Sequence, residues 1–342
     1  MSNLQTKYLG LDLKNPIIIG ASNIVTDLDN LQKLEKAGAA AVVYKSLFEE
    51  QIQYESYQMQ QESEAYSHWD AEHETMFPEM DHAGPSQHLL ELEKARSVLS
   101  IPLIGSLNCI LNETWVDYAM EMEKTGIDAL ELNFYTHITD PNQSGDQIVE
   151  NQVETLQRVK EALSIPVSVK LSPFYTNPLQ VINKLNAAGA DGFILFNRLF
   201  QPDIDIIHEA HHFPYNFSQS NDSRLALRYA GLLHGSMTSS ICSNTGIFFG
   251  EDVIKMLLAG ADVVQIVSAI YKKGISYLPK LIEDIEKWME NKKYSSISEF
   301  RGKLSKRNMT DPFAYKRAQY VDILLRSDLL MTYHPKESDE YI

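Results

Sequence analysis

Charged and amide side chains occur inside two apolar segments where a buried strand alone does not require them. Residues 129–133 read Ala-Leu-Glu-Leu-Asn, and residues 167–173 read Val-Ser-Val-Lys-Leu-Ser-Pro. Because side chains alternate along a strand, Glu131, Asn133 and Lys170 share one face and the leucines and valines share the other. A lysine in the middle of a strand that helices cover needs an anion or an acceptor. We therefore consider two roles for Lys170: contact with a ligand, or a structural ion pair with Glu131.

Polar residues also follow the other apolar segments of the chain. The set combines two lysines with amides and hydroxyls: Ser22, Lys45, Ser46, Asn108, Asn133, Lys170, Asn197, Asn244 and Ser268. It contains neither paired carboxylates nor a trio of metal ligands, so we predict no metal site. Cys109, just past the third apolar segment, is either a reactive thiol or a buried structural cysteine.

Two loops near the end of this series have the composition of a phosphate site. Asn244-Thr245-Gly246 precedes a helix that we expect to begin near Gly250, and the last apolar segment ends at Ser268. Backbone amides in such loops, together with the N-terminus of a short helix, bind phosphate groups in parallel barrels. The sequence therefore predicts either a phosphorylated ligand at these loops or an ordinary capped helix.

A recurring phrase indicates how these segments are connected. Variants of Ala-Gly-Ala-Asp appear at residues 37–39, 125–128, 188–191 and 259–262, each after a helical pattern and before an apolar run. Glycine after a helix is a common C-terminal cap, so the phrase marks a repeated helix-to-strand unit. Eight strands are predicted near residues 17, 41, 103, 129, 167, 192, 238 and 263, the seventh spanning 237–241.

Eight alternating strand and helix units predict an α/β fold with a closed (β/α)8 TIM barrel, in which the residues after the strands converge on one site. An open sheet is the alternative, although no Gly-x-Gly-x-x-Gly turn follows the first strand. We assign the barrel to residues 1–304, with long loops at 49–85 and 201–222. Residues 305–342 are predicted to form a helical extension and tail that packs on the barrel or on a second subunit.

Composition limits the classes of partner and location. The 342 residues are 44% apolar, which is enough for a large core, and the net charge of −16 disfavours nucleic acid. Cys109 and Cys242 are the two cysteines of the chain, too few for a disulfide framework, and nowhere do eighteen apolar residues run together. We expect a cytoplasmic protein that does not associate with membranes and acts on a small molecule. The histidine groups at 68–73 and 208–212 lack the spacing of metal ligands.

Taken together, these motifs resemble those of dihydroorotate dehydrogenases, most closely the soluble class 1 enzymes. The resemblance extends to about Leu304. It rests on an ordered set of motifs: Asn15-Pro16 with Ala21-Ser22, Lys45-Ser46, Glu131-Leu132-Asn133, residues 169–173, Gly246-Ile247 with residues 250–252, residues 259–266, and residues 300–304.

The resemblance implies an FMN-dependent oxidoreductase of pyrimidine biosynthesis that acts on a CH-CH bond and forms a homodimer. Hydride would pass from dihydroorotate, or a related dihydropyrimidine, to N5 of the flavin. The implied FMN contacts are Ala21, Ser22, Lys45, Ser46, Asn133, Lys170, Asn197, Asn244, Thr245, Gly246 and Ser268. The implied substrate contacts are Lys45, Asn133 and Asn197. Lys170 would stabilise the negative charge of the reduced flavin.

The catalytic base of this family lies on the loop after the fourth strand. The soluble enzymes carry Cys-Pro-Asn there, whereas this chain has Thr136-His137-Ile138. A threonine hydroxyl needs a relay to act as a base, and histidine titrates near neutral pH. Thr136 and His137 are therefore the two candidates for the base.

Two other functions are compatible with the same residues. A barrel that binds a sugar phosphate could use Lys170 or Lys45 for Schiff-base or proton-transfer chemistry. The chain could also be a flavin-binding relative without catalysis.

Overall fold

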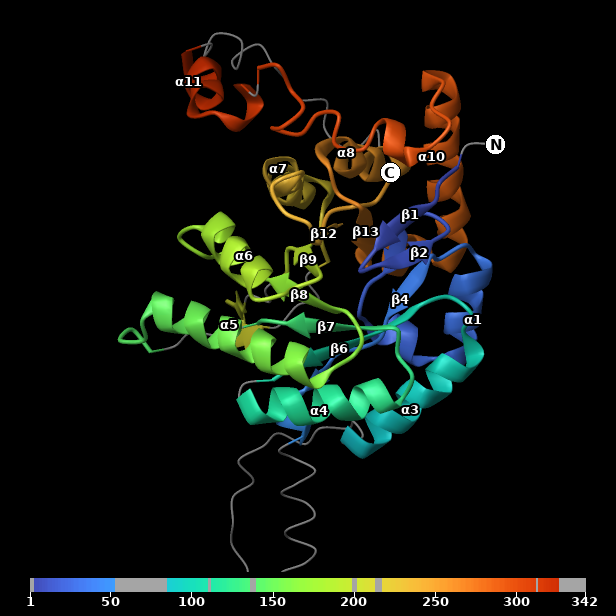
Figure 1. The fold of residues 1–342 in the computed structure, drawn as a ribbon, viewed down its shortest axis with the longest axis vertical. Helices are drawn as coiled ribbons and strands as arrows, with labels where there is room; N and C mark the ends of the chain where they lie inside the picture. The colour runs from blue at the N-terminus through green and yellow to red at the C-terminus, as the bar shows by residue number, and fades with distance from the viewer. Residues whose placement is uncertain are drawn as a thin grey trace, which may run out of the picture.

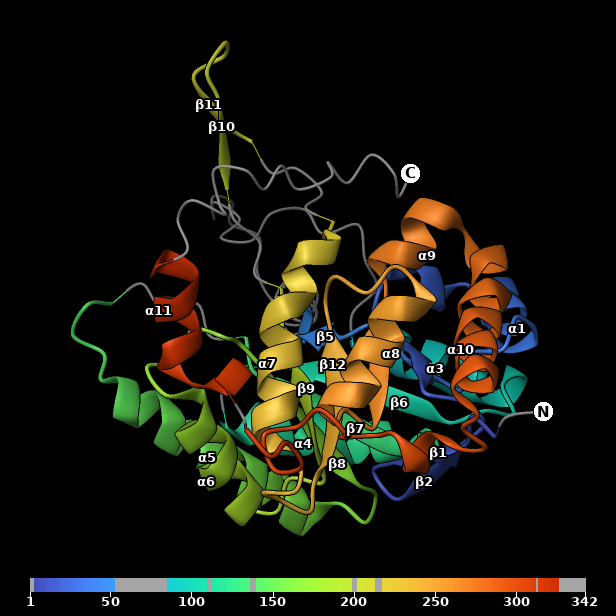
Figure 2. The same ribbon diagram turned by 90° about the horizontal axis from the view of Figure 1, so that it is seen from above.

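Eight parallel strands close into a barrel with helices around it (Figures 1 and 2). The computed structural model describes residues 3–52, 85–109, 112–135, 140–198, 202–212, 217–311 and 313–325. The barrel strands are β3 (Ile17–Ile19), β4 (Ala41–Val43), β6 (Leu103–Asn108), β7 (Ala129–Asn133), β8 (Val167–Leu171), β9 (Gly192–Leu195), β12 (Ser240–Asn244) and β13 (Val263–Ile266). They pair in the order β4-β3-β13-β12-β9-β8-β7-β6, and β6 pairs back with β4. The predicted (β/α)8 barrel is confirmed.

Helices follow the strands and cover the outside of the barrel (Figure 1). They are α1 (Leu28–Lys36), α3 (Pro85–Val98), α4 (Asn112–Lys124), α5 (Gly145–Ala162), α6 (Pro178–Ala187), α7 (Ser223–Leu233), α8 (Gly250–Ala259), α9 (Ser268–Lys273) and α10 (Leu278–Lys292). A two-residue strand, β5 (Leu47–Phe48), pairs with the last residues of β6, beyond those that pair with β4. Within the described part of the chain, no helix has the length and apolar character needed to cross a membrane.

The seventh barrel strand begins three residues later than predicted. Instead of residues 237–241, it comprises Ser240–Asn244 and pairs Ser240 with Gly192. The chain leaves α7 through Gly235, which has a φ of 75°, and the Ser239 hydroxyl then donates to the carbonyl of Ala190 at 2.7 Å. Residues 237–239 therefore belong to the connection, and the strand itself is largely polar, so no apolar alternation marks its start.

Alternation along the strands divides the interior into two cores. The outward side chains, such as Leu130 and Val169, are fully buried against the helices. The inward side chains near the start of the strands, such as Ala129 and Ile194, form a second apolar cluster inside the barrel. Because the same period continues along β7, Glu131 follows Ala129 on the inner face.

An N-terminal hairpin closes the bottom of the barrel. It consists of β1 (Thr6–Tyr8) and β2 (Leu11–Leu13), joined at Leu9 and Gly10, which both have positive φ as a type I′ turn requires. Tyr8, Leu9 and Leu13 are buried in the inner apolar cluster, and the Leu9 backbone N–H donates to the Ser240 hydroxyl at 3.1 Å. The sequence analysis missed this hairpin because each of its strands has only three residues.

The predicted long loops and the C-terminal extension are described only in part. Of the loop at 49–85, residues 53–84 lie outside the described residues. In the loop at 201–222, β10 (Asp203–Asp205) and β11 (Ala210–His212) form a hairpin that projects from the barrel (Figure 2). In the extension, α11 (Arg317–Leu325) follows a segment whose Tyr315 hydroxyl donates to the Leu304 carbonyl at 2.8 Å. The domain boundary near residue 304 stays a prediction.

Replacing Leu13 by alanine should destabilise the fold. Leu13 is 2% exposed, so the change removes buried apolar contacts and leaves a cavity beneath the barrel, at a cost of about 2–5 kcal/mol. The measurement is the free energy of unfolding in urea. Asp12→Ala, on the exposed side of the same strand, is the control and should change it by less than about 0.5 kcal/mol. Equal effects of the two variants would contradict the burial of this hairpin.

His88 on α3 should make the fold sensitive to mild acid. Burial, followed by the positive charge of Lys45, lowers the pKa of His88 from 6.5 to about 4. The unfolded chain therefore takes up a proton between pH 6.5 and about 4 that the folded chain excludes, so stability falls as the pH falls through this window, by about 3 kcal/mol. Chemical denaturation at a series of pH values measures this slope.

The control separates His88 from the many carboxylates that titrate in the same range. His88→Met should reduce the slope, because the Nε2 atom of His88 is buried without a hydrogen bond in the described structure. His212→Gln, at an exposed position of β11, should leave the slope unchanged. A slope that neither substitution alters would contradict the assignment.

Candidate active site

A cavity of about 690 Å³ opens where the carboxyl ends of the barrel strands meet. Most of the predicted cofactor contacts line this cavity: Ala21, Ser22, Lys45, Ser46, Lys170, Asn197, Asn244, Thr245, Gly246 and Ser268. The volume lies within the range of about 300–1,000 Å³ typical of sites for small ligands and cofactors. Residues that are far apart in the sequence are therefore gathered as the barrel architecture predicts.

The floor of the cavity holds a buried ion pair. Lys170 Nζ lies 3.5 Å from Glu131 Oε1, and the side chains of Lys170 and Glu131 are 10% and 1% exposed. Gln265 Nε2, on β13, donates to Glu131 Oε2 at 2.7 Å. In β7 and β8, Asn133 pairs with Lys170, so Glu131 is the diagonal neighbour of Lys170. The predicted ion pair is present, and Lys170 also lines the cavity, so the two roles considered for it are compatible.

Two asparagine side chains are linked at the rim. Asn197 Nδ2 donates to Asn133 Oδ1 at 2.5 Å, and Asn108 Nδ2 donates to the Asn133 carbonyl at 2.9 Å. Asn197 lines the cavity. Asn133 does not, but its hydrogen bond orients the Asn197 side chain. These bonds fix which atoms of the amides face the cavity.

The opposite side of the rim carries Lys45 and three hydroxyls. The Ser46 hydroxyl is hydrogen-bonded to that of Ser106 at 2.7 Å, and both residues are buried. The Ser22 hydroxyl is buried at the cavity without a hydrogen-bond partner among the described residues, and Gln265 Oε1 likewise has none. Buried polar atoms without partners indicate a place where a ligand supplies them.

The loop after β12 has an unusual backbone. Thr245 and Gly246 have φ values of 74° and 72°, and a Cβ on Gly246 would lie 2.4 Å from the Ser223 backbone nitrogen. A β-branched residue with positive φ is a strained feature, which clusters at ligand sites. Within the described chain, the backbone N–H groups of Gly246 and Ile247 make no hydrogen bond.

The N-terminus of α8 is an ordinary capped helix, which is one of the two alternatives that the sequence leaves open. The Asp252 carboxylate accepts hydrogen bonds from the Phe248 and Phe249 backbone N–H groups, at 3.0 and 3.1 Å. These amides are therefore occupied by the protein itself. Among the described residues, no side chain caps the start of α9.

Several lining residues were missed by the sequence analysis. They include Arg198, Phe217, Ser218, Gln265 and Tyr271. Gln265 could have been found, because it is the inward polar residue of β13 as Glu131 is of β7. The sequence around Phe217 and Ser218 has no periodic pattern, so no sequence signal places them here.

Other candidates fall outside the site. Thr136 and His137, the two candidates for the base, lie outside the described residues. Cys109 is buried, and burial raises the pKa of its thiol, which favours the structural alternative. No group of metal ligands occurs in the part of the chain that the structure describes. His208 is paired with Asp205 at 2.6 Å.

Comparison with known proteins identifies the relatives of this barrel. The catalytic subunit of dihydroorotate dehydrogenase B (NAD(+)) of Methanocaldococcus jannaschii is 27% identical over 294 residues, which cover 82% of this chain and 92% of that protein. The corresponding subunit of Pyrococcus abyssi is 27% identical over 306 residues, covering 87% of this chain and 98% of that protein. Dihydroorotate dehydrogenase A (fumarate) of Limosilactobacillus reuteri is 29% identical over 214 residues, covering 59% of this chain and 68% of that protein.

The family model described as dihydroorotate dehydrogenase matches residues 77–289, which is more than half of the 342 residues. The matched region includes β6 to β13 and therefore both strands of the buried ion pair. The chain belongs to the dihydroorotate dehydrogenase family.

Proposed function

We propose that the chain is an FMN-dependent oxidoreductase that oxidises dihydroorotate or a related dihydropyrimidine. The observation that carries this proposal is the ion pair of Lys170 and Glu131 at the floor of the barrel cavity. A fixed, buried ammonium group at the base of a ligand cavity is an arrangement that stabilises negative charge on a bound ring. Membership of the dihydroorotate dehydrogenase family supports the same reaction.

The residues present are suited to FMN. The ring would contact the floor at Lys170 and Gln265. The unpartnered Gln265 Oε1 could accept a hydrogen bond from it, and the Ser22 hydroxyl could donate one to it. The phosphate would bind at the backbone N–H groups of Gly246 and Ile247 and at the start of α9. When bound, FMN supplies the hydride acceptor that no side chain can provide.

Lys170 carries the electrostatic part of the proposed reaction. Its ammonium group lies 3.5 Å from Glu131 Oε1, and Gln265 donates to the other oxygen of Glu131 from across the barrel. The group therefore needs no reorganisation when negative charge develops above it. Glu131 also supplies the counter-charge without which the buried ammonium group would be more strongly destabilising.

Lys45 and the linked asparagines would orient the substrate. Asn197 is fixed by Asn133, so the protein directs the remaining hydrogen-bonding groups of the Asn197 amide.

The proton would be removed by Thr136 through a relay or by His137, on the loop after β7. The homodimer, the cytoplasmic location and the role in pyrimidine biosynthesis also stay predictions. Two archaeal relatives are named as catalytic subunits, so a different subunit is a further candidate partner.

The direct test is a flavin spectrum of the purified protein, followed by anaerobic titration with dihydroorotate. The proposal requires bound FMN and bleaching of its absorbance by the substrate. A colourless protein that takes up no FMN would contradict the proposal. If borohydride also traps a sugar phosphate covalently on Lys170 or Lys45, the Schiff-base alternative is the better one.

Removal of the ammonium group should slow the reaction of the bound flavin. Lys170→Met alone leaves Glu131 buried without a counter-charge, so we pair it with the double variant Lys170→Met/Glu131→Gln, which removes both charges. Anaerobic stopped-flow bleaching by dihydroorotate should slow roughly 100-fold in the double variant, the scale seen when one preorganised donor is lost. Lys184→Met, at an exposed position of α6, is the control. Unchanged flavin content and bleaching rate in the double variant would refute the role of Lys170.

A further inference from the structure

The side-chain amide of Gln265 has two ends with different surroundings at the floor of the cavity. Its Nε2 atom donates to Glu131 Oε2 at 2.7 Å, whereas its Oε1 atom is buried without a hydrogen-bond partner among the described residues. Gln265 is 1% exposed and lines the cavity. A buried acceptor that the protein leaves unpaired is destabilising, so a ligand that brings a donor to this oxygen would bind favourably.

Glu131 determines which end of the amide faces the cavity. The Glu131 carboxylate forms an ion pair with Lys170, and an ionised carboxylate accepts hydrogen bonds but donates none. If the amide were turned by half a rotation, Gln265 Oε1 would lie against Glu131 Oε2, and two acceptors would meet. The oxygen of Gln265 is therefore the end that is left for a ligand, and the ligand atom that meets it must carry a hydrogen.

A glycine leaves this oxygen uncovered. Gly20 directly follows β3, and a Cβ atom at this position would lie 3.4 Å from Gln265 Oε1 and 2.8 Å from Val267 Cγ2. Two residues further along the chain, the Ser22 hydroxyl is also buried at the cavity without a partner among the described residues. The unpaired oxygen and the unpaired hydroxyl therefore belong to neighbouring parts of the floor.

Lys170 supplies donors on the other side of Gln265. Glu131 lies between the two side chains, with one oxygen 3.5 Å from Lys170 Nζ and the other bonded to Gln265. An ammonium group has three hydrogens, so Lys170 keeps donors for the cavity that it lines. From β8 to β3, the floor presents a donor at Lys170, an acceptor at Gln265 and a hydroxyl at Ser22.

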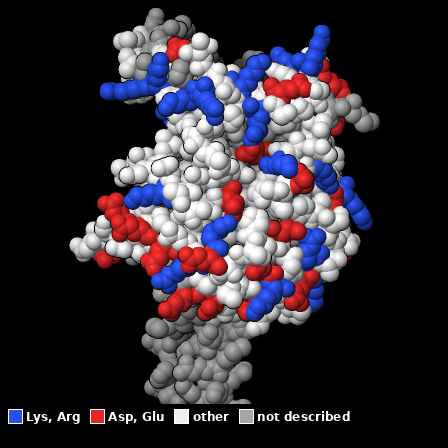
Figure 3. Space-filling model, in the orientation of Figure 1, with Lys and Arg blue, Asp and Glu red and all other residues white. Residues whose placement is uncertain are grey.

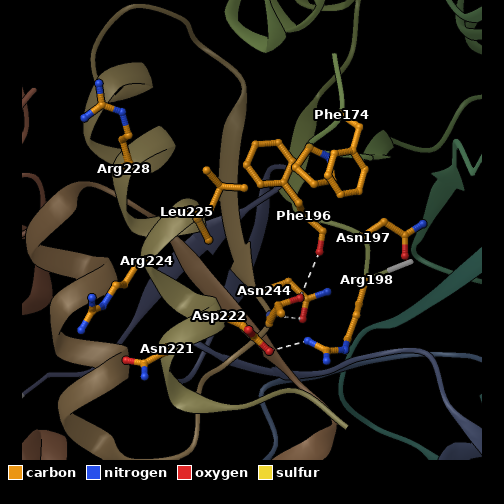
Figure 4. Close-up of a pocket in the computed structure, with 13 residues that line it drawn as sticks. Phe174, Phe196, Asn197, Arg198, Asn221, Asp222, Arg224, Leu225, Arg228 and Asn244 are labelled. Carbon is orange, nitrogen blue, oxygen red and sulfur yellow. Dashed lines mark hydrogen bonds and ion pairs between the residues drawn. The ribbon is translucent and has the colours of Figure 1, made fainter. Parts of the chain in front are cut away.

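The floor differs from the surface in its balance of charge. Lys, Arg, Asp and Glu side chains are spread over the face of the molecule that Figure 3 shows. Figure 4 shows Arg198, at the rim of the cavity, directed toward Asp222 just before α7. At the floor, Lys170 and Glu131 balance each other. A cationic donor would be repelled by Lys170, so the hydrogen that meets Gln265 belongs to a neutral group.

From this arrangement we infer that Gln265 binds the imide edge of the flavin, where one N–H group lies between two carbonyl groups, and thereby sets the orientation of the ring. The inference rests on the proposed function. Gln265 Oε1 accepts from the N3–H group, and Lys170 and Ser22 donate to the carbonyl oxygens on either side. Glu131 is a positioning residue, because it holds the Gln265 amide in the accepting orientation.

A dihydropyrimidine carries the same imide edge, so the substrate is a second source of this chemistry. The proposed function places the flavin ring at the floor beside Lys170, and we therefore assign Gln265 to the flavin. Separate measurements with flavins and with pyrimidines distinguish the two sources.

The test compares FMN with 3-methyl-FMN, in which a methyl group replaces the hydrogen on N3. The flavin-containing protein is dialysed against equal concentrations of the two flavins, and the bound flavins are then released and quantified by mass spectrometry. The test variant is Gln265→Met, which keeps the approximate size of the side chain but removes the acceptor. Gln180→Met, at an exposed position of α6, is the control.

Wild-type protein should retain FMN over 3-methyl-FMN by about 10- to 100-fold, because the methyl group leaves Gln265 Oε1 buried and unpaired. Gln265→Met should reduce this preference to less than about threefold, and Gln180→Met should leave it unchanged. Equal retention of the two flavins by the wild-type protein would overturn the inference. So would a preference that persists in Gln265→Met, because it would mean that the methyl group is excluded for lack of space.

Gln265→Met leaves Glu131 Oε2 without its donor, so urea unfolding of each variant is measured as well. If this variant does not fold, Lys170→Met/Glu131→Met/Gln265→Met replaces it, since the triple variant leaves none of the three groups unpaired. The triple variant should likewise lose the preference for FMN over 3-methyl-FMN, and its retention of the preference would contradict the role of Gln265.

The substrate is tested as the source with orotate and 3-methylorotate, whose binding to the flavin-containing protein is followed by the change in flavin absorbance. Gln265→Met should leave the ratio of their dissociation constants within about twofold of the wild-type ratio. A larger change, with an unaltered flavin preference, would assign Gln265 to the substrate and overturn the inference. Failure of the proposed function is distinguishable. A protein that neither holds nor takes up flavin contradicts both proposals, whereas a flavoprotein that binds the two flavins equally contradicts the role of Gln265 alone.

Discussion

The charge pair of Glu131 and Lys170 is the constraint on which the mouth of this barrel depends. Both groups are buried in the barrel interior, where an isolated charge is unstable, so each requires the other. The remaining oxygen of Glu131 is bonded by Gln265, a residue 134 positions away in the sequence. Three strands are thereby joined through their side chains as well as through the backbone ladder. Loss of either charge alone would leave a buried ion and cost about 3–5 kcal/mol.

The interior of the barrel changes in character from one end to the other. Apolar side chains such as Ala129 and Ile194 fill the lower part, the ion pair forms the middle, and amides such as Asn197 lie at the rim. This order follows directly from the period of two along each strand, since successive inward residues of β7 are Ala129, Glu131 and Asn133. The same spacing that packs the core therefore delivers polar groups to the open end.

The sequence contained enough information for the architecture and for much of the cavity, because both depend on local patterns. Lys170 is the penultimate residue of β8 and Asn197 follows the end of β9, and the carboxyl ends of the strands of a parallel barrel converge. What escaped prediction depends on tertiary contacts or on short segments. The hairpin of β1 and β2 has strands of three residues, β12 is largely polar, and Phe217 reaches the cavity from an irregular loop. The sequence left open whether the amides before α8 bind a ligand or are capped by the protein, and the structure shows that Asp252 accepts their hydrogen bonds.

The hairpin beneath the barrel limits the route by which ligands reach the cavity. Tyr8, Leu9 and Leu13 seal the lower end, so the interior resembles a cup and not a tube. A ligand that contacts the Lys170 ammonium group must therefore enter and leave through the open end of the barrel. Two compounds that use this one opening must therefore bind in turn.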